Sequence, residues 1–233
     1  YTLSLHDALP ISKTAVVGYT NAGKSTLMNR LLNMSEGTDE SKQVYEHNSL
    51  FATLDTSVRR IAIRGRRPFL LIDTVGFINE LPHTLVKAFR STLEETLYAD
   101  LLLEVVDISD SEYRECMRVT DETLAQIGAG ALPRITVFNK SDLVIPEIEY
   151  PAVHGDSIYM SAGRSEGLEL LLDAIEEHME KQRSRQSFVL PYSRGDLLNR
   201  LIESGDAESV EYAEDGVHVT ALLRPGEIEG YTL

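Results

Sequence analysis

The sequence predicts an α/β fold in which a mainly parallel sheet is flanked by helices, followed by a small α+β domain. Short apolar runs of strand length alternate with longer segments whose apolar residues recur at helical spacing. This alternation is typical of a parallel sheet that is covered on both faces. After residue 186 the alternation stops, and extended runs joined by a tight turn follow. We therefore expect one domain over residues 13–183 and a second over 187–233.

The first twelve residues, YTLSLHDALPIS, resemble nothing that follows and end immediately before an apolar strand. We interpret residues 1–12 as a non-native extension left by cloning or sequencing, and a native flexible arm is the alternative. The N-terminal stretch also lacks the basic segment followed by an apolar segment that marks a signal peptide.

Apolar runs that end in polar or glycine-containing turns are the expected strands of the first domain. A hairpin is expected as well, between Arg60–Ile63 and Pro68–Ile72, joined by Arg64–Arg67. The runs are Ala15–Val17, Phe69–Ile72, Leu101–Val106, Ile135–Phe138 and Ile158–Met160.

Helices are expected between these strands. Leucine and phenylalanine recur every four positions over residues 85–97, and a second apolar face covers residues 168–175. Ser109 and Glu112 have the spacing of a capping box, which predicts a helix that starts there and runs to about Ile127.

The second domain is short, so we expect it to form a small appendage with little core of its own. A polar linker precedes it near Lys181–Gln186. Its expected elements are an extended run Ser187–Leu190, a helix Gly195–Ser204, and two extended runs, Ser209–Tyr212 and Val217–Leu223, joined by a turn at Asp215-Gly216.

Composition excludes several classes of function. The chain of 233 residues carries a net charge of -15, which argues against free-standing binding to DNA, RNA or anionic lipid. Its longest apolar runs are too short to span a bilayer. The single cysteine, Cys116, has no partner for an internal disulfide, which fits a reducing compartment. We expect a monomeric cytoplasmic protein without a membrane partner.

The segment Gly18-Tyr-Thr-Asn-Ala-Gly-Lys-Ser25 lies between a predicted strand and a predicted helix. Glycines let such a loop wrap tightly, so that backbone N–H groups and the helix N-terminus face phosphates. Lys24 would reach the β- and γ-phosphates, and the Ser25 hydroxyl would bind Mg²⁺. The expected phosphate-binding residues are Gly18, Tyr19, Thr20, Asn21, Ala22, Gly23, Lys24, Ser25 and Thr26.

Asp73-Thr-Val-Gly76 closes the next apolar strand. The Asp73 carboxylate there can hold a water on Mg²⁺, and the Gly76 N–H can meet the γ-phosphate. The tetrapeptide is common by itself, but its position one strand after the phosphate-binding loop makes it informative.

Asn139-Lys-Ser-Asp142 follows a later strand, and its chemistry selects guanine. The Asp142 carboxylate can accept hydrogen bonds from guanine N1–H and the 2-amino group, whereas adenine would leave it unpaired. Asn139 would connect this loop to the phosphate-binding loop, and the stem of Lys140 would cover the base. Ser161-Ala162, after the next strand, would supply a backbone N–H for guanine O6.

The four motifs, in this order, resemble those of the G domain of translation-factor-class GTPases. The G domain is a P-loop NTPase fold. The segments GYTNAGKSTL, FATLDTSVRRI, DTVGFINELPHTLVKAFRSTLEET and FVLPYSRGDLLNRL resemble the HflX family of ribosome-associated GTPases. The resemblance implies that Thr53 is the switch I threonine that binds Mg²⁺, with Thr56 as an alternative, and that Phe51 contacts the nucleotide. The implied catalytic residues are Lys24, Thr53 and Gly76, and the implied Mg²⁺ ligands are Ser25, Thr53 and Asp73.

The resemblance further implies Mg²⁺-dependent hydrolysis of GTP to GDP and phosphate, with the large ribosomal subunit as the partner of the full-length protein. HflX proteins carry an N-terminal domain and a helical linker before the G domain, and neither matches this sequence. Two other readings stay open: an Era- or Obg-type ribosome-assembly GTPase, and a nucleotide-binding module without significant turnover.

Three further features each have two interpretations. Asn21 matches an asparagine that helps to bind K⁺ in some related GTPases, or it stabilises its loop. Phe77 stands where Ras-like enzymes carry a water-orienting glutamine, which predicts slow turnover, or it packs under switch II. The basic cluster is a local rRNA contact or a solvated hairpin edge; it comprises Arg59, Arg60, Arg64, Arg66 and Arg67.

Overall fold

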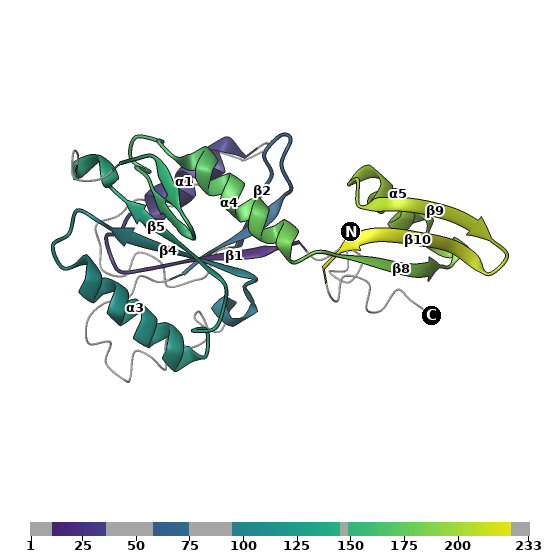
Figure 1. The fold of residues 1–233 in the computed structure, drawn as a ribbon, viewed down its shortest axis with the longest axis horizontal. Coiled ribbons are helices and arrows are strands. Elements are labelled where there is room, and N and C mark those ends of the chain that lie inside the picture. Colours follow the sequence, from purple (N-terminus) through teal and green to yellow (C-terminus); the bar gives the residue numbers. More distant parts are fainter. Residues whose placement is uncertain (1–10, 36–57, 75–94, 145–148, 225–233) are drawn as a thin grey trace. The chain divides into compact units, whose positions relative to one another are not determined.

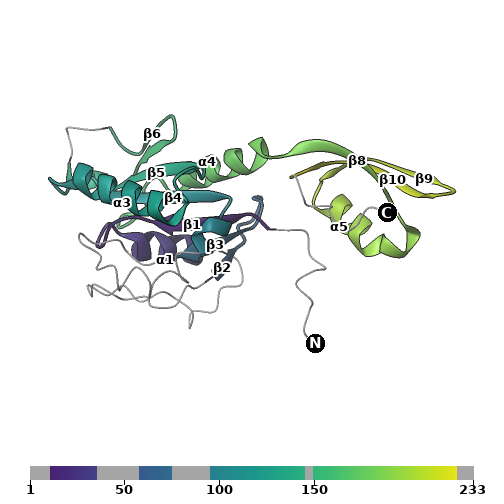
Figure 2. The ribbon, with the colours of Figure 1, turned by 90° about the horizontal axis from the view of Figure 1, so that it is seen from below.

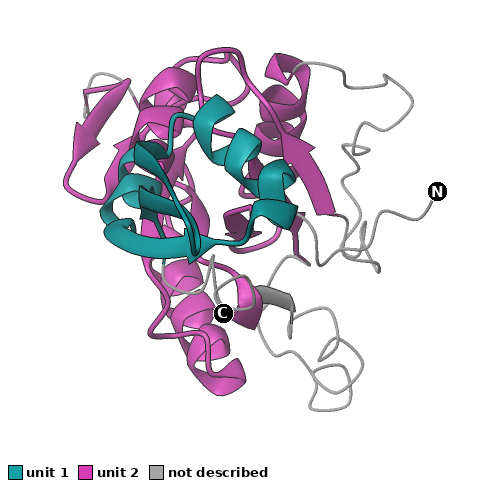
Figure 3. Cartoon of the chain, turned by 90° about the vertical axis from the view of Figure 1, so that its right-hand side faces the viewer, with its two compact units in different colours: residues 1–10, 177–233 teal, residues 11–176 magenta. Residues whose placement is uncertain are grey.

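The computed structural model describes residues 11–35, 58–74, 95–144 and 149–224 (Figure 1). They fall into two compact units, of which the first covers residues 11–176 and the second begins at Glu177. Figure 3 colours the two units separately. No helix within the described ranges is long and apolar enough to cross a membrane.

The first unit is built on a seven-stranded sheet with the order β2-β3-β1-β4-β5-β7-β6. Its five central strands run parallel, whereas the edge strands β2 and β6 pair antiparallel with β3 and β7. The strands are β1 Lys13–Val17, β2 Val58–Ile61, β3 Phe69–Asp73, β4 Leu101–Asp107, β5 Arg134–Asn139, β6 Ala152–His154 and β7 Ser157–Tyr159.

Helices cover both faces of this sheet. Figure 1 shows α1 (Lys24–Met34) and α4 (Leu168–Lys181) above it and α3 (Tyr113–Ile127) below it, and Figure 2 gives the view from below. Side chains of α1 and of the start of α4 line one groove. Strand β4 is buried on both faces, from Leu101 through Val106, and all of these residues except Glu104 are apolar.

The parallel strands begin and end close to where the sequence predicts them, and the differences lie at the edges. β2 ends at Ile61, two residues before the predicted Ile63, and the sequence analysis did not find the three-residue strand β6. The fold also includes Ser12, since its carbonyl accepts a hydrogen bond of 2.7 Å from the Leu70 N–H. Of the helix predicted over 85–97, the described part holds a short 3₁₀ helix, Glu95–Tyr98.

The capping-box prediction is wrong. Helix α3 begins at Tyr113, and its N-cap residue Glu112 makes no side-chain capping bond. The Ser109 hydroxyl instead donates to the Asp107 carboxylate at 2.5 Å, and the Glu112 N–H donates to Asp110 Oδ1 at 2.9 Å. These local turns satisfy the polar groups one turn before the helix, as serine and aspartate often do.

The second unit contains an antiparallel sheet with the order β8-β10-β9. Contrary to the expectation of little core, the helix α5 packs its leucines on one face of this sheet, where they form a core with alternate residues of β10. Strand β8 begins at Ser184, inside the predicted polar linker, because the backbone of residues 184–186 continues the ladder with β10. The elements are β8 Ser184–Leu190, a 3₁₀ turn Tyr192–Arg194, α5 Gly195–Glu203, β9 Ala207–Ala213 and β10 Gly216–Leu223.

Candidate functional site

The loop between β1 and α1 has a backbone that requires glycine at two positions. Gly18 and Gly23 have φ angles of 137° and 96°. A Cβ at Gly18 would lie 2.2 Å from the Val105 carbonyl oxygen, and one at Gly23 would lie 2.2 Å from Asn139 Nδ2. The two glycines therefore allow the loop to pack directly against β4 and against the end of β5.

Lys24, the first residue of α1, folds back under this loop. Its Nζ donates to the carbonyl oxygens of Gly18 at 2.9 Å and Tyr19 at 2.7 Å. Burial lowers the pKa of Lys24 to about 8, although the negative charge of Asp73 opposes that shift. The ammonium group is thus held at the phosphate-binding loop in a largely desolvated position.

Asp73 ends β3 beside the phosphate-binding loop. Its register partner on β1 is Val16, and its side chain is buried. The next residue, Thr74, donates its hydroxyl proton to the Val16 carbonyl at 2.5 Å, which joins the ends of the two strands. The hydroxyl of Ser25 and the carboxylate of Asp73 are hard oxygen donors of the kind that Mg²⁺ prefers, so the residues present fit this ion.

Several predicted site residues lie outside the described residues. They are Phe51, Thr53, Thr56, Gly76 and Phe77. Their expected roles therefore stay predictions.

Asn139 joins three loops of the site. Its Nδ2 donates to the Ala22 carbonyl at 2.8 Å, and its Oδ1 accepts a hydrogen bond of 2.9 Å from the Ala162 N–H. The side chain is only 3% exposed, so both bonds are made away from solvent. The link that the sequence predicts between Asn139 and the phosphate-binding loop is present.

The loop after Asn139 is fixed by its own contacts. Lys140 adopts a left-handed conformation with φ 60°, and its Nζ lies 2.5 Å from Asp107 Oδ2. The Ser141 N–H donates to the Met160 carbonyl at 3.1 Å, and its hydroxyl donates to the Phe138 carbonyl at 2.8 Å. These contacts set the backbone position from which Asp142 projects.

Asp142 has an ionic partner that the sequence analysis missed. Nε of Arg164 lies 3.1 Å from Asp142 Oδ2. The signal in the sequence was an arginine two residues after Ser161-Ala162, the dipeptide that marks the neighbouring loop. Spacing alone did not reveal the contact, because 21 positions separate the two residues along the chain and only the fold brings them together.

The Ser161-Ala162 loop uses its backbone donors within the protein. The Ser161 N–H donates to the Glu166 carbonyl at 3.0 Å, and the Ala162 N–H donates to Asn139. Guanine O6 would therefore have to share the Ala162 N–H or use that of Gly163, which is exposed. Arg30 of α1, a second residue that sequence reasoning missed, donates to the carbonyls of Ala162 at 3.1 Å and Gly163 at 2.9 Å.

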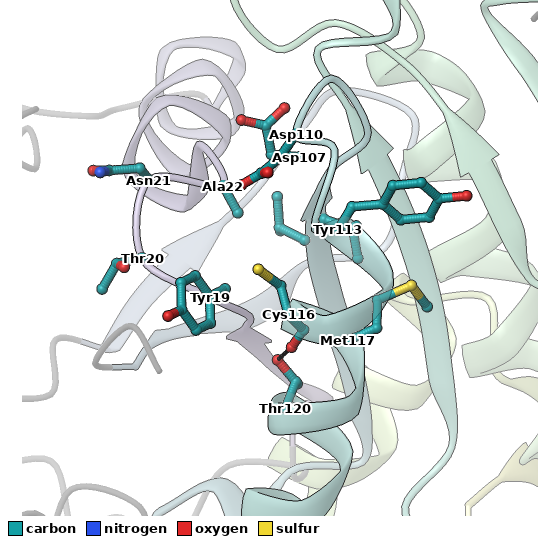
Figure 4. Close-up of a pocket in the computed structure, with 12 residues that line it drawn as sticks. Tyr19, Thr20, Asn21, Ala22, Asp107, Asp110, Tyr113, Cys116, Met117 and Thr120 are labelled. Carbon is teal, nitrogen blue, oxygen red and sulfur yellow. Dashed lines mark hydrogen bonds between the residues drawn. The ribbon is translucent and has the colours of Figure 1, made fainter. Parts of the chain in front are cut away.

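A cavity of about 150 Å³ lies between the phosphate-binding loop and α3 (Figure 4). Tyr19–Ala22, the end of β4 and the first turns of α3 line it. Cys116 of α3 is one of the lining residues. Burial raises the pKa of its thiol, and the nearby Asp110 carboxylate adds a smaller increase. A raised pKa disfavours the thiolate and agrees with a structural cysteine. Figure 4 shows the Asn21 side chain pointing away from Cys116.

The arginine cluster of the β2–β3 hairpin divides into bound and exposed side chains. Arg66 makes ion pairs with three acidic side chains of α4: Glu169 at 2.8 Å, Asp173 at 2.6 Å and Glu176 at 3.1 Å. Arg60 and Arg64, in contrast, are exposed. The pattern of basic residues in the sequence could not separate the two groups, because the acids that bind Arg66 lie more than a hundred positions later.

Comparisons with known proteins agree with this geometry. The family model described as 50S ribosome-binding GTPase matches residues 13–140. GTPase HflX of Caldanaerobacter subterraneus subsp. tengcongensis is 44% identical, over 91% of this chain and 47% of its own length. GTPase HflX of Escherichia coli is 36% identical, over 88% of this chain and 47% of its own length. The chain thus spans about half the length of the curated relatives it matches.

Solved structures show the same fold. A GTP-binding protein from Sulfolobus solfataricus, in complex with GDP, is 30% identical with a TM-score of 0.51, over 72% of this chain and 52% of that one. Era from Aquifex aeolicus, bound to GDP and AlF4-, is 24% identical with a TM-score of 0.52, over 72% of this chain and 56% of that one. At that identity the Era structure supports the fold alone.

Proposed function

Because the chain belongs to the HflX family within the 50S ribosome-binding GTPases, we propose that it binds GTP beside Lys24 and hydrolyses it to GDP and phosphate. The observation that carries this proposal is the pair of hydrogen bonds at Asn139. They join the loop suited to phosphates with the two loops suited to guanine, so that one nucleotide can bind to all three.

The phosphates would bind to the backbone N–H groups of the loop from Gly18 to Ser25, at the N-terminus of α1. Lys24 would release the two carbonyls that it contacts and donate to the β- and γ-phosphates. Ser25, Asp73 through a water, and Thr53 would hold Mg²⁺, whose charge offsets the negative charge of the phosphates.

The guanine base would be read by Asp142, which accepts from N1–H and from the 2-amino group. The aliphatic stem of Lys140 would cover one face of the base, and its ion pair with Asp107 fixes the position of that stem. Adenine presents no donor at these positions and would leave a carboxylate unpaired, so GTP is favoured over ATP.

A monovalent ion at Asn21 remains a second proposal within the same site. Asn21 has φ 61°, a conformation that asparagine adopts more readily than most residues, and this gives it a reason to be there without an ion. Hydrolysis rates in KCl and NaCl at equal ionic strength separate the two roles. A faster rate in KCl supports K⁺ binding, and equal rates leave only the conformational role.

The large ribosomal subunit is the partner that the family description suggests, and it supports our proposal of a cytoplasmic location. On a chain with net charge -15, the exposed Arg60 and Arg64 offer a local basic contact for RNA. The chain spans about half of its HflX relatives, so ribosome binding by the whole protein is part of the proposal.

Calorimetric titration with GDP and ADP tests the binding step. We expect GDP to bind and ADP to bind at least about a thousandfold more weakly, since a site that requires a missing hydrogen bond can discriminate this strongly. The variant Lys24→Ala should lose affinity for GDP, and Lys13→Ala, which replaces an exposed lysine in β1, is the matched control. Equal affinities for GDP and ADP would contradict the proposal.

A further inference from the structure

We propose that Arg164 is a positioning residue for guanine recognition, because it holds the Asp142 carboxylate in the orientation that reads the base. This inference rests on the proposed function, since it concerns how the same site selects its nucleotide. Arg164 lies outside the four motifs from which that site was predicted.

The contact joins a fixed carboxylate to a fixed loop. Nε of Arg164 lies 3.1 Å from Asp142 Oδ2, and the Asp142 side chain is 12% exposed. The Arg164 N–H donates to Ser161 Oγ at 3.3 Å, and Arg30 donates to the carbonyl of Gly163 at 2.9 Å. The peptide group that precedes Arg164 is therefore held through both of its polar atoms.

The charges around this pair make Arg164 the counterion of Asp142. The hydroxyl of Tyr150 is hydrogen-bonded to Glu166, and that bond raises the pKa of Tyr150. The positive charge of Arg164 lowers this pKa, whereas the negative charge of Asp142 raises it. Within the described ranges, Arg164 is the cation that the ion pairs place on Asp142.

The geometry allows Arg164 and guanine to use the carboxylate together. A carboxylate offers about four lone-pair positions on its two oxygens. Arg164 occupies one on Oδ2, and guanine needs only one on each oxygen. The arginine can therefore stay in place while the base binds, and the carboxylate need not lose rotational freedom at that step.

The exposure of Arg164 distinguishes positioning from structural support. Its side chain is 56% exposed, and ion pairs this exposed contribute little to folding stability. Removal of Arg164 should therefore affect nucleotide selectivity and leave the melting temperature nearly unchanged.

The test measures affinities for GDP, IDP and ADP in wild type, Arg164→Ala and Arg164→Lys. IDP lacks the 2-amino group of GDP. Its base can therefore donate only the N1–H to the Asp142 carboxylate, whereas guanine donates two hydrogen bonds. We expect Arg164→Ala to weaken GDP binding by about threefold to tenfold. This factor corresponds to the free-energy cost of ordering one side chain on binding. IDP should lose less, so the preference for GDP over IDP should shrink, and Arg164→Lys should restore part of it. The matched control is Arg118→Ala, which removes an arginine of similar exposure with two carboxylate partners on α3.

A double-mutant cycle with Asp142→Ala completes the test. If Arg164 acts through Asp142, Arg164→Ala should have no effect on GDP affinity once Asp142 is replaced. An unchanged or tighter GDP affinity in Arg164→Ala overturns the inference, and so does an equal loss for GDP, IDP and ADP with a lower melting temperature. A wild-type protein that binds ADP as tightly as GDP instead overturns the proposed function.

Discussion

Lys24 illustrates how burial sets the chemistry of a single residue in this protein. The sequence places a lysine at the end of a phosphate-binding loop, but its protonation depends on the fold. Desolvation brings its pKa down to about 8, in spite of the nearby Asp73 carboxylate. The charge that attracts phosphate therefore titrates close to physiological pH when no nucleotide is bound.

The first prediction is that GDP affinity depends on pH through Lys24. The protonated form binds phosphate, and bound phosphate raises the pKa of the ammonium group. Below about pH 8, Lys24 of the free protein is already protonated, so the affinity for GDP should be constant. Above that pH, the affinity for GDP should fall by up to about tenfold per pH unit. Calorimetry across this range measures it, with Lys24→Arg as a control whose guanidinium does not titrate. The same slope in both proteins would contradict the assignment.

A second prediction at the residue scale concerns Asp142. Asp142→Asn should weaken GDP binding by about a hundredfold, because an amide N–H then faces a guanine donor in place of an acceptor. Xanthine carries an oxygen at C2 that accepts from the new amide, so XDP should bind the variant better than GDP does. Competition between XDP and GDP measures the preference. If the variant keeps the preference of the wild type, Asp142 does not read the base.

At the scale of elements, the site depends on loops that are held together by one buried amide. β1, β5 and β7 end at the same edge of the sheet because they are parallel, and the loops that follow them meet there. Asn139 then fixes two of these loops to its own. The strands determine which loops become neighbours, and the amide determines how they fit together.

The third prediction is that Asn139→Ala separates these loops. It leaves the Ala162 N–H without its acceptor, so the free energy of unfolding should fall by about 1–3 kcal/mol. GDP affinity should fall as well, because the guanine and phosphate loops no longer share a link. Chemical denaturation and calorimetry measure the two effects, with the exposed Asn199→Ala on α5 as a control. Unchanged GDP affinity in a folded variant would contradict the role of this link.

The fourth prediction concerns the β2–β3 hairpin. The double variant Arg60→Glu and Arg64→Glu should weaken association with large ribosomal subunits and reduce its salt dependence, since phosphate contacts release counterions. GDP binding should stay unchanged. Co-sedimentation at several salt concentrations measures this, and Arg118→Glu on α3 is the control. Retention of full ribosome binding by the hairpin variant, with loss in the control, would place the contact elsewhere.

At the scale of the whole molecule, the sequence predicts the parallel core and the phosphate-binding motif, because both are written in local patterns. Apolar runs mark β1, β3, β4 and β5, and glycine spacing marks the loop before α1. Contacts between distant positions could not be predicted in this way. The pairing of Arg164 with Asp142 and the binding of Arg66 by α4 depend on which residues the fold brings together.

The fifth prediction is that the protein hydrolyses GTP slowly without a partner. Phe77 has no group that could orient the attacking water, and it follows the motif that begins at Asp73. The rate should therefore be on the order of 10⁻⁴–10⁻² s⁻¹, as in GTPases that await a partner. Single-turnover assays measure it, and a rate above about one per second would contradict this reasoning.

Release of phosphate from GTP over multiple turnovers, with and without large ribosomal subunits, tests the central claim most directly. We expect slow release from GTP alone, none above background from ATP, and faster release from GTP when subunits are present. Lys24→Ala should abolish release under every condition, which excludes a contaminating GTPase. Equal release from GTP and ATP, or activity that survives in Lys24→Ala, would contradict the assignment of this site as a guanine-specific GTPase centre.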